Sequence, residues 1–214
     1  MTATLLIVAA LAALGDWAAV AQRRRHLEWL LKPLVLLLIT LAAASADLST
    51  GKAWLVLAFV YSLIGDIAIM LAEDELGSTD PRFLFGVVAF FAAHVCFIGG
   101  FVDHGLHSLQ ALAGLLVVAG TSALVMPRLL PAVLRTGGTR LMLLLGGYSL
   151  SLAAMVVLGV GTASIGVAVG AVLFLASDSL LAWDRFHTRI PNGPLAVAIT
   201  YHLAQLLILV GMQK

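Results

Sequence analysis

The sequence predicts an all-α, polytopic membrane protein, folded as a bundle of eight transmembrane helices in a single domain over residues 1–214. Of these residues 62% are hydrophobic and only 11% are charged, with a mean hydropathy of +1.08. Soluble domains are about 45 to 50% apolar. The apolar residues also fall into segments of about 20 residues, the length that crosses a bilayer core. The connections between these segments are short and leave no space for a soluble domain.

In chain order, the eight predicted helices span residues 3–21, 31–47, 52–72, 82–102, 106–126, 139–159, 162–183 and 191–212. The first is predicted as a spanning helix, because a cleaved signal peptide would carry basic residues before its apolar run. Lys32 and Pro33 begin the second helix, where proline suits the first turn. The many Gly, Ala and Ser residues favour close helix packing.

The basic residues predict the orientation. Ten of the twelve fall on one side of the predicted bundle: Arg23, Arg24, Arg25, Lys32, Arg82, Arg128, Arg135, Arg140, Arg185 and Arg189. The positive-inside rule places that side in the cytoplasm and both termini outside, and the asymmetry also supports an even number of helices. We expect an integral protein of the bacterial inner membrane. The net charge of +1 argues against a nucleic-acid partner.

Two carboxyl groups interrupt the apolar segments. Asp178 lies within GAVLFLASDSLLAW, and Asp66 lies within SLIGDIAIM. A charged side chain near the bilayer centre costs roughly 2.5 to 3.5 kcal/mol, so each is a functional candidate. Asp66 lies roughly 9 Å inside its cytoplasmic helix end, at 1.5 Å of rise per residue. Asp178 lies at nearly the same level, so the two are expected to share a pocket in the cytoplasmic half.

Other polar side chains of the spans are expected to join this pocket: Ser62, His94, Tyr148, Ser177, Tyr201, His202 and Gln205. Lys32 would cap it from the cytoplasmic rim. Each has a structural alternative, as an interhelical hydrogen-bonding group or a satisfied core histidine, and the two acids as a hydrogen-bonded pair or as partners of Lys32. Asp16, near Arg23 and the interface, is ambiguous between a structural and a functional role.

The motifs of several other site classes are missing from the chain. Two Asp and two His would supply oxygen and nitrogen ligands, but there is no HExxH or similar close-spaced pair. There is also no phosphate-binding loop and no GxSxG elbow. Cys96 is alone, which rules out an intramolecular disulfide and a CxxC metal site. We therefore expect no metal and no cofactor.

In their order and spacing, several motifs resemble the lysoplasmalogenase (YhhN-like) family of eight-helix membrane proteins. The matching elements are Lys32 with Pro33, SLIGD at 62–66, FLFGVVAFFAAH at 83–94, Tyr148, GAVLFLASDSLLA at 170–182, and YHLAQ at 201–205. One departure is Phe97, where the family often has a tyrosine. The resemblance implies hydrolysis of the vinyl ether bond of lysoplasmalogens, giving a fatty aldehyde and a glycerophospho-base.

Buried carboxyl groups suit this chemistry. Protonation of the outer vinyl carbon gives an oxocarbenium ion, which water attacks, so the reaction needs an acid and then a base. Our hypothesis assigns these two roles to Asp66 and Asp178, in either order, with His94 and Tyr201 orienting them or the water. The predicted substrate-binding residues are Lys32, Ser62, Tyr148, Ser177, His202 and Gln205. The expected partners are a lysophospholipid and membrane lipids, with no prediction of the oligomeric state.

Two alternatives remain open at this stage. A multi-pass transporter or lipid-binding protein would use the buried Asp and His residues as a proton or cation site. A hydrolase of the same kind would act on another lipid headgroup or ester. Product analysis with vinyl ether and ester lysophospholipids separates all three.

Overall fold

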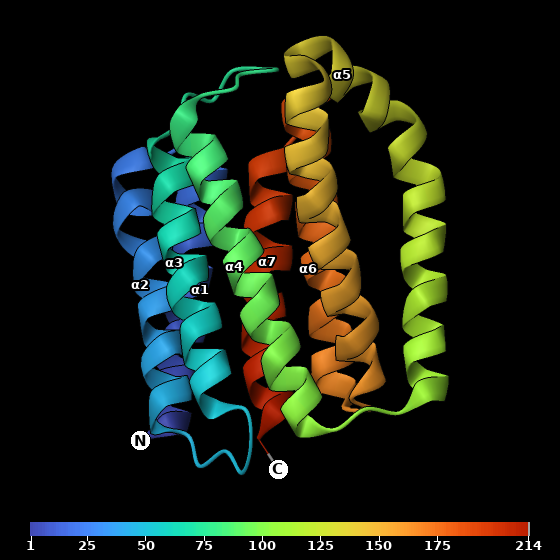
Figure 1. Ribbon diagram of the computed structural model, residues 1–214. Coiled ribbons are helices and arrows are strands. Elements are labelled where there is room, and N and C mark those ends of the chain that lie inside the picture. Colours follow the sequence, from blue (N-terminus) through green and yellow to red (C-terminus); the bar gives the residue numbers. More distant parts are fainter. Residues whose placement is uncertain (214) are drawn as a thin grey trace.

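Helices make up almost the whole chain in the computed structural model, which describes residues 1–213 (Figure 1). The seven helices in this range are α1 (Thr2–Ala21), α2 (Arg25–Ser45), α3 (Lys52–Leu71), α4 (Pro81–His104), α5 (Ser108–Gly161), α6 (Ile165–Phe186) and α7 (Gly193–Met212). Each is long and apolar enough to cross a membrane. The described residues contain no strand. The predicted all-α class of apolar helices is confirmed.

The predicted count of eight helices is not confirmed, because the segments expected at 106–126 and 139–159 both belong to α5. This helix has 54 residues, far more than a bilayer requires. The backbone leaves helical geometry at Gly138 (φ 62°, ψ −158°), and Pro127 and Pro131 lie shortly before it. In Figure 1, α5 turns over between its two parts, which run in opposite directions. We call residues 108–126 the first arm, 127–138 the bend and 139–161 the second arm.

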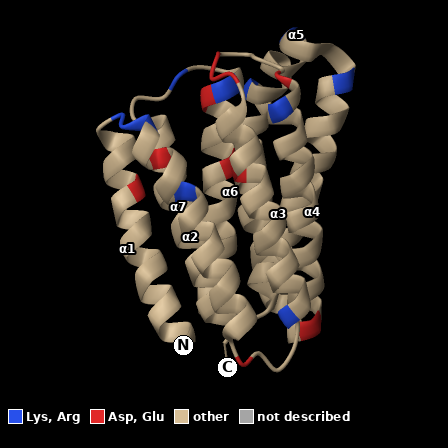
Figure 2. Ribbon diagram, turned by 90° about the vertical axis from the view of Figure 1, so that its left-hand side faces the viewer, with Lys and Arg blue, Asp and Glu red and all other residues tan. Residues whose placement is uncertain are grey.

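The helices form a closed ring in chain order. Each packs against the helix before and after it, and α1 completes the ring by packing against α7. Both termini lie at the same end of the bundle (Figure 1), as the sequence predicted. Most Lys and Arg residues lie at the opposite end (Figure 2). The basic side predicted from the sequence is therefore one end of the bundle, and its cytoplasmic location stays a prediction.

Small residues allow α3 and α4 to approach closely beside Asp66. A Cβ atom on Gly65 would lie 2.6 Å from the Phe90 ring, and one on Gly86 would lie 2.7 Å from Ile69. Both contacts are too short for any side chain, so the glycines of the SLIGD and FLFG motifs serve the packing of these helices. They bring Asp66 next to the aromatic residues of α4.

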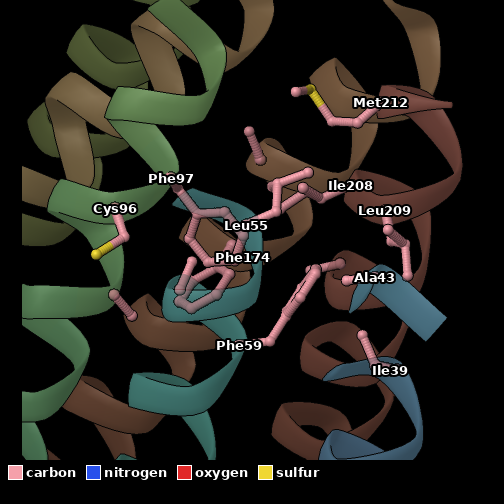
Figure 3. Packing of buried hydrophobic residues seen from close by; sticks show 14 of the residues in the cluster. Ile39, Ala43, Leu55, Phe59, Cys96, Phe97, Phe174, Ile208, Leu209 and Met212 are labelled. Carbon is pink, nitrogen blue, oxygen red and sulfur yellow. The ribbon is translucent and has the colours of Figure 1, made fainter. Parts of the chain in front are cut away.

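The larger of the two apolar core clusters includes Phe90, Phe174 and Tyr201, which places it next to the polar site. Phe59, Phe97 and Phe174, from three helices, point toward one another in Figure 3, with ring centroids 5.5 Å and 6.2 Å from Phe97. Phe97 is completely buried. The position where the family resemblance leads us to expect a tyrosine hydroxyl is therefore part of the core packing in this chain.

The start of α2 differs from the prediction. The helix begins at Arg25, six residues earlier than expected, so Pro33 lies inside it instead of in its first turn. Proline has no N–H group, which removes one hydrogen bond of the helix immediately after Lys32. The apolar count missed this first turn and a half because it contains Arg25, His26 and Glu28.

The connection between α3 and α4, residues 72–80, is fastened to α6 by Arg185. Its guanidinium donates to the backbone carbonyls of Ser78 and Glu73, both at 3.2 Å, and its Cζ lies 3.8 Å from the centre of the Phe83 ring. At the end of this connection, the Asp80 carboxylate accepts hydrogen bonds from the backbone N–H groups of Glu73 and Arg82. These bonds lower the pKa of Asp80. The connection therefore covers the basic end of the bundle next to α6.

Candidate active site

A cavity of about 590 Å³ lies among α3, α4, α6 and both arms of α5. Most of its lining is apolar, from residues such as Val87, Leu129 and Leu145. Six of the ten predicted site residues also line it: Lys32, Asp66, Tyr148, Ser177, Asp178 and Tyr201. Asp66 and Asp178 therefore face one cavity, as the depth count from the sequence predicted.

Asp66 meets a cation at the cavity wall. Its Oδ1 lies 3.9 Å from the Nζ of Lys32, and the two side chains are 5% and 15% exposed. Pro33, which has no backbone N–H group to donate, follows directly after this lysine inside α2. An ammonium group at this distance stabilises the ionised form of the carboxyl. Asp66 is thus the carboxyl group of the cavity that has a positive partner.

Asp178 has neutral partners instead. Its Oδ2 accepts a hydrogen bond from the Tyr148 hydroxyl, and the Nε2 of His94 lies 4.0 Å from the same oxygen. Within residues 1–213, no Lys or Arg forms an ion pair with it.

The tautomer of His94 follows from its neighbours. The Ser151 hydroxyl donates to the Tyr148 backbone carbonyl at 2.7 Å, so the same oxygen accepts from the Nδ1 of His94 at 3.1 Å. A neutral imidazole with a proton on Nδ1 has its lone pair on Nε2. This nitrogen is buried and has no hydrogen-bond partner in the described part of the chain. His94 therefore directs a proton-accepting atom toward Asp178.

Tyr201 lines the cavity together with Asp66. Two other predicted site residues lie near Tyr201 but outside the cavity lining. Ser62 and Gln205 are completely buried and lie within interaction range of the Tyr201 hydroxyl. None of the three side chains has a partner in direct hydrogen-bond geometry among residues 1–213. Ser62 and Gln205 are outside the cavity lining, so they are placed to orient Tyr201 and not to touch a ligand there.

Ser177 and His202 are placed differently from the other predicted binding residues. Ser177 borders the cavity, but its hydroxyl donates to the Val197 carbonyl at 3.2 Å. His202 lies outside the lining, between α7 and α1. Its Nδ1 accepts from the Trp17 indole N–H at 3.1 Å and lies 3.9 Å from Oδ2 of Asp16. The structure thus separates His202 from the cavity.

Sequence reasoning assigned no role to Ser151 or Trp17. Ser151 follows Tyr148 by three residues, which places both on one helix face. Trp17 gave no signal, because an indole near a membrane interface needs no partner. Within residues 1–213, no group of three or more His, Cys, Asp or Glu side chains is arranged to hold a metal ion.

Comparison with known proteins identifies relatives of this chain. Residues 27–212 match the YhhN family. Lysoplasmalogenase TMEM86B of Sus scrofa is 36% identical over 157 residues, covering 73% of this chain and 62% of that protein. The TMEM86B lysoplasmalogenase of Mus musculus is 33% identical, covering 84% of this chain and 72% of its own length. A lysoplasmalogenase of Mycobacterium bovis is 32% identical, covering 81% and 66%.

The chain thus spans between 62% and 72% of the length of these relatives. No solved structure matches it. The family match includes Asp66, Asp178, His94 and Tyr148, but it begins after α1, which carries Asp16.

Proposed function

Because the chain belongs to the YhhN family, we propose that it is a membrane-embedded hydrolase that cleaves the vinyl ether bond of lysoplasmalogens. The products would be a fatty aldehyde and a glycerophospho-base. Three relatives with 32% to 36% identity are named lysoplasmalogenases. The observation that carries the proposal is a pair of buried carboxyl groups, Asp66 and Asp178, facing one apolar cavity.

The lining of the cavity fits an amphiphile with one long chain. Apolar side chains dominate it, and its charged groups are Lys32, Asp66 and Asp178. A hydrocarbon chain would bury its surface against the apolar part. The ammonium group of Lys32 would bind the lipid phosphate as a point charge. The vinyl ether, next to the glycerol, would then lie near the two carboxyl groups.

We assign the acid role to Asp178 and the ionised role to Asp66. Lys32 stabilises the charged form of Asp66 at 3.9 Å, whereas Asp178 has only a hydroxyl and an imidazole nearby. A carboxyl group in apolar surroundings without a cation retains its proton, as in other enzymes that use a buried acid. This assignment selects one of the two orders that the sequence left open.

The reaction would proceed in two stages. Asp178 protonates the outer vinyl carbon, the C=C π electrons form the new C–H bond, and the adjacent carbon becomes an oxocarbenium ion. Asp66 stabilises this cation and takes a proton from the attacking water, which Tyr201 helps to orient. The resulting hemiacetal then expels the glycerol oxygen, which takes the proton from Asp66, while the hemiacetal hydroxyl gives its proton to Asp178 and becomes the aldehyde carbonyl. His94 would hold or return the proton of Asp178 through its Nε2 atom.

Incubating the purified protein with a lysoplasmalogen and with the matching ester lysophospholipid tests the proposal. We expect aldehyde from the first substrate and no fatty acid from the second. Asp66→Asn should reduce aldehyde release by about a hundredfold or more, the usual contribution of a catalytic base. Its elution profile should match that of the wild type, which shows that the variant is folded.

The same incubation tests the alternatives. Fatty acid from the ester substrate would indicate a hydrolase for another lipid class. If neither substrate gave a product, the vinyl ether hydrolase would be rejected, and the buried Asp and His residues would be tested as a proton or cation site in a transporter. Full turnover by Asp66→Asn would reject the two-carboxyl mechanism.

A further inference from the structure

The two arms of α5 touch at the end of the bundle with the termini. A Cβ atom on Gly114 of the first arm would lie 3.0 Å from the Cα of Val157 on the second. At Gly161, a Cβ atom would lie 3.3 Å from Ala111, and the His107 N–H donates to the Gly161 carbonyl at 2.8 Å. The arms are therefore in backbone contact at this level.

Closer to the bend, the two arms of α5 separate from each other. Cβ atoms on Gly146 and Gly147 of the second arm would have nothing within 4 Å. Both glycines are exposed at the surface and also line the cavity. Leu143 and Leu150 on the same arm are 66% and 72% exposed and line it as well. The cavity wall between the arms thus reaches the surface of the bundle that faces lipid.

The other approach to the cavity, from the basic end, is covered. Arg185 fastens the connection between α3 and α4 over Phe83, and the Gly77 N–H donates to the Arg185 carbonyl at 2.7 Å. Phe83 and Phe186, which line the cavity at this end, are buried and pack edge to face with centroids 5.8 Å apart. A hydrocarbon chain arriving from this side would have to cross water and displace these contacts.

We propose that the opening between the arms of α5, at Gly146 and Gly147, is a lateral portal through which the hydrocarbon chain of a lysophospholipid passes between the bilayer and the cavity. This inference rests on the proposed function, because it takes the lipid substrate from there. Lateral entry keeps the chain in apolar surroundings along its whole path. The portal also lies next to Tyr148, whose hydroxyl donates to Asp178.

The two glycines determine the width of the portal. Adjacent glycines inside a helix are unfavourable relative to alanine, and no close neighbour requires them here. Because glycine has no side chain, only backbone atoms line the opening at these two positions. A leucine at either position would extend into the portal without meeting another atom on its Cβ.

The test substitutes leucine at three glycines of α5. Gly146→Leu and Gly147→Leu narrow the portal. The matched control is Gly120→Leu, which also has nothing within 4 Å of its Cβ but lies outside the cavity lining. Each variant is assayed for kcat/KM with a long-chain and a short-chain lysoplasmalogen, and its thermal unfolding midpoint is measured. Gly147→Ala serves as a milder change if a leucine variant fails to fold.

We expect the ratio of long-chain to short-chain kcat/KM to fall roughly tenfold or more in Gly146→Leu and Gly147→Leu, since a few misfitting methylene groups have effects of that size. The ratio in Gly120→Leu should equal that of the wild type. An unchanged ratio in both folded portal variants would overturn the portal.

A second measurement separates the portal from the hydrolase. A lysophospholipid with a photoactivatable diazirine in its chain should label residues 118–126 and 142–150 in the wild type and Gly120→Leu. This labelling should be lost in Gly147→Leu. Labelling at these residues by a wild type that releases no aldehyde would reject the hydrolase and support the portal. If the protein hydrolysed the substrate but labelling were confined to other helices, the portal would be rejected and the proposed hydrolase activity would be retained.

Discussion

Two pairs, each made of one carboxyl group and one imidazole, are buried in this bundle. They differ in whether a ligand in the cavity can reach the carboxyl group. Asp178 and His94 are 4.0 Å apart, and Asp16 and His202 are 3.9 Å apart. Asp178 lines the cavity and its side chain is 13% exposed, whereas Asp16 is completely buried. Separation is nearly the same and residue type is identical in the two pairs, so access to a ligand is the first feature that distinguishes a candidate site from an internal polar contact.

The pairs also differ in the tautomer of the histidine. The Trp17 indole is a donor only, so Nδ1 of His202 accepts and its proton is on Nε2. His94 has the opposite arrangement, because its Nδ1 donates to Ser151. The free lone pair of His94 faces Asp178, whereas that of His202 is occupied by Trp17. Only the first pair is arranged to exchange a proton.

The largest expected effect comes from removing the acid of the pair that lines the cavity. Asp178→Asn should lower the kcat for aldehyde release by about a hundred to ten thousandfold, the range of a general acid. The isosteric Asp16→Asn should change kcat by less than about threefold, because that side chain is sealed from the cavity. The measurement is steady-state turnover of a lysoplasmalogen in detergent micelles. Equal losses in both folded variants would show that the enclosed pair takes part in the reaction.

The histidines should show the same contrast at a smaller scale. His94→Gln should reduce kcat by about tenfold to a hundredfold, since it removes a proton acceptor that assists Asp178 without being the acid itself. His202→Gln should leave kcat close to that of the wild type and lower the thermal midpoint. A variant of His202 that lost turnover while retaining its stability would contradict this division.

The hydroxyl that fixes the His94 tautomer offers a finer test. Ser151→Ala removes the acceptor for His94 Nδ1, and the ring can then adopt the other tautomer. We expect kcat to fall by about threefold to tenfold, while the KM for the lipid stays unchanged because Ser151 lies outside the cavity lining. Ser151→Thr keeps the hydroxyl and should restore most of the rate. A change confined to KM would place Ser151 in substrate binding instead.

The smallest effect is expected in the enclosed pair. Trp17→Phe removes the hydrogen bond to His202 and should lower the free energy of unfolding by about 0.5 to 1.5 kcal/mol, the net value of one such bond. Aldehyde release should be unaffected. Reversible denaturation in mixed micelles, with the wild type as reference, measures the first value. A wild-type stability would show that this bond contributes nothing to the fold.

Local sequence predicted part of the site. The depth of Asp66 and Asp178 follows from counting residues along two helices, because the rise of a helix is constant. The role of Asp16 was left open between structure and function, because its position near Arg23 and the membrane interface did not indicate which side chains would contact it. Ser62 and Gln205 were recognised as polar, but their position behind Tyr201 depends on the rotation of α3 and α7.

By itself, the sequence determined that the chain forms apolar helices, where most of them begin and end, and which carboxyl groups lie inside them. These properties depend on composition over about 20 neighbouring residues. Only the tertiary structure decided how the two arms of α5 are joined at its bend, and that the adjacent Tyr201 and His202 face different surroundings. Successive residues of a helix point about 100° apart, so the face that meets the cavity depends on packing between helices distant in the chain. Because of that packing, Asp66 and Asp178, which lie at the same depth, line a single cavity.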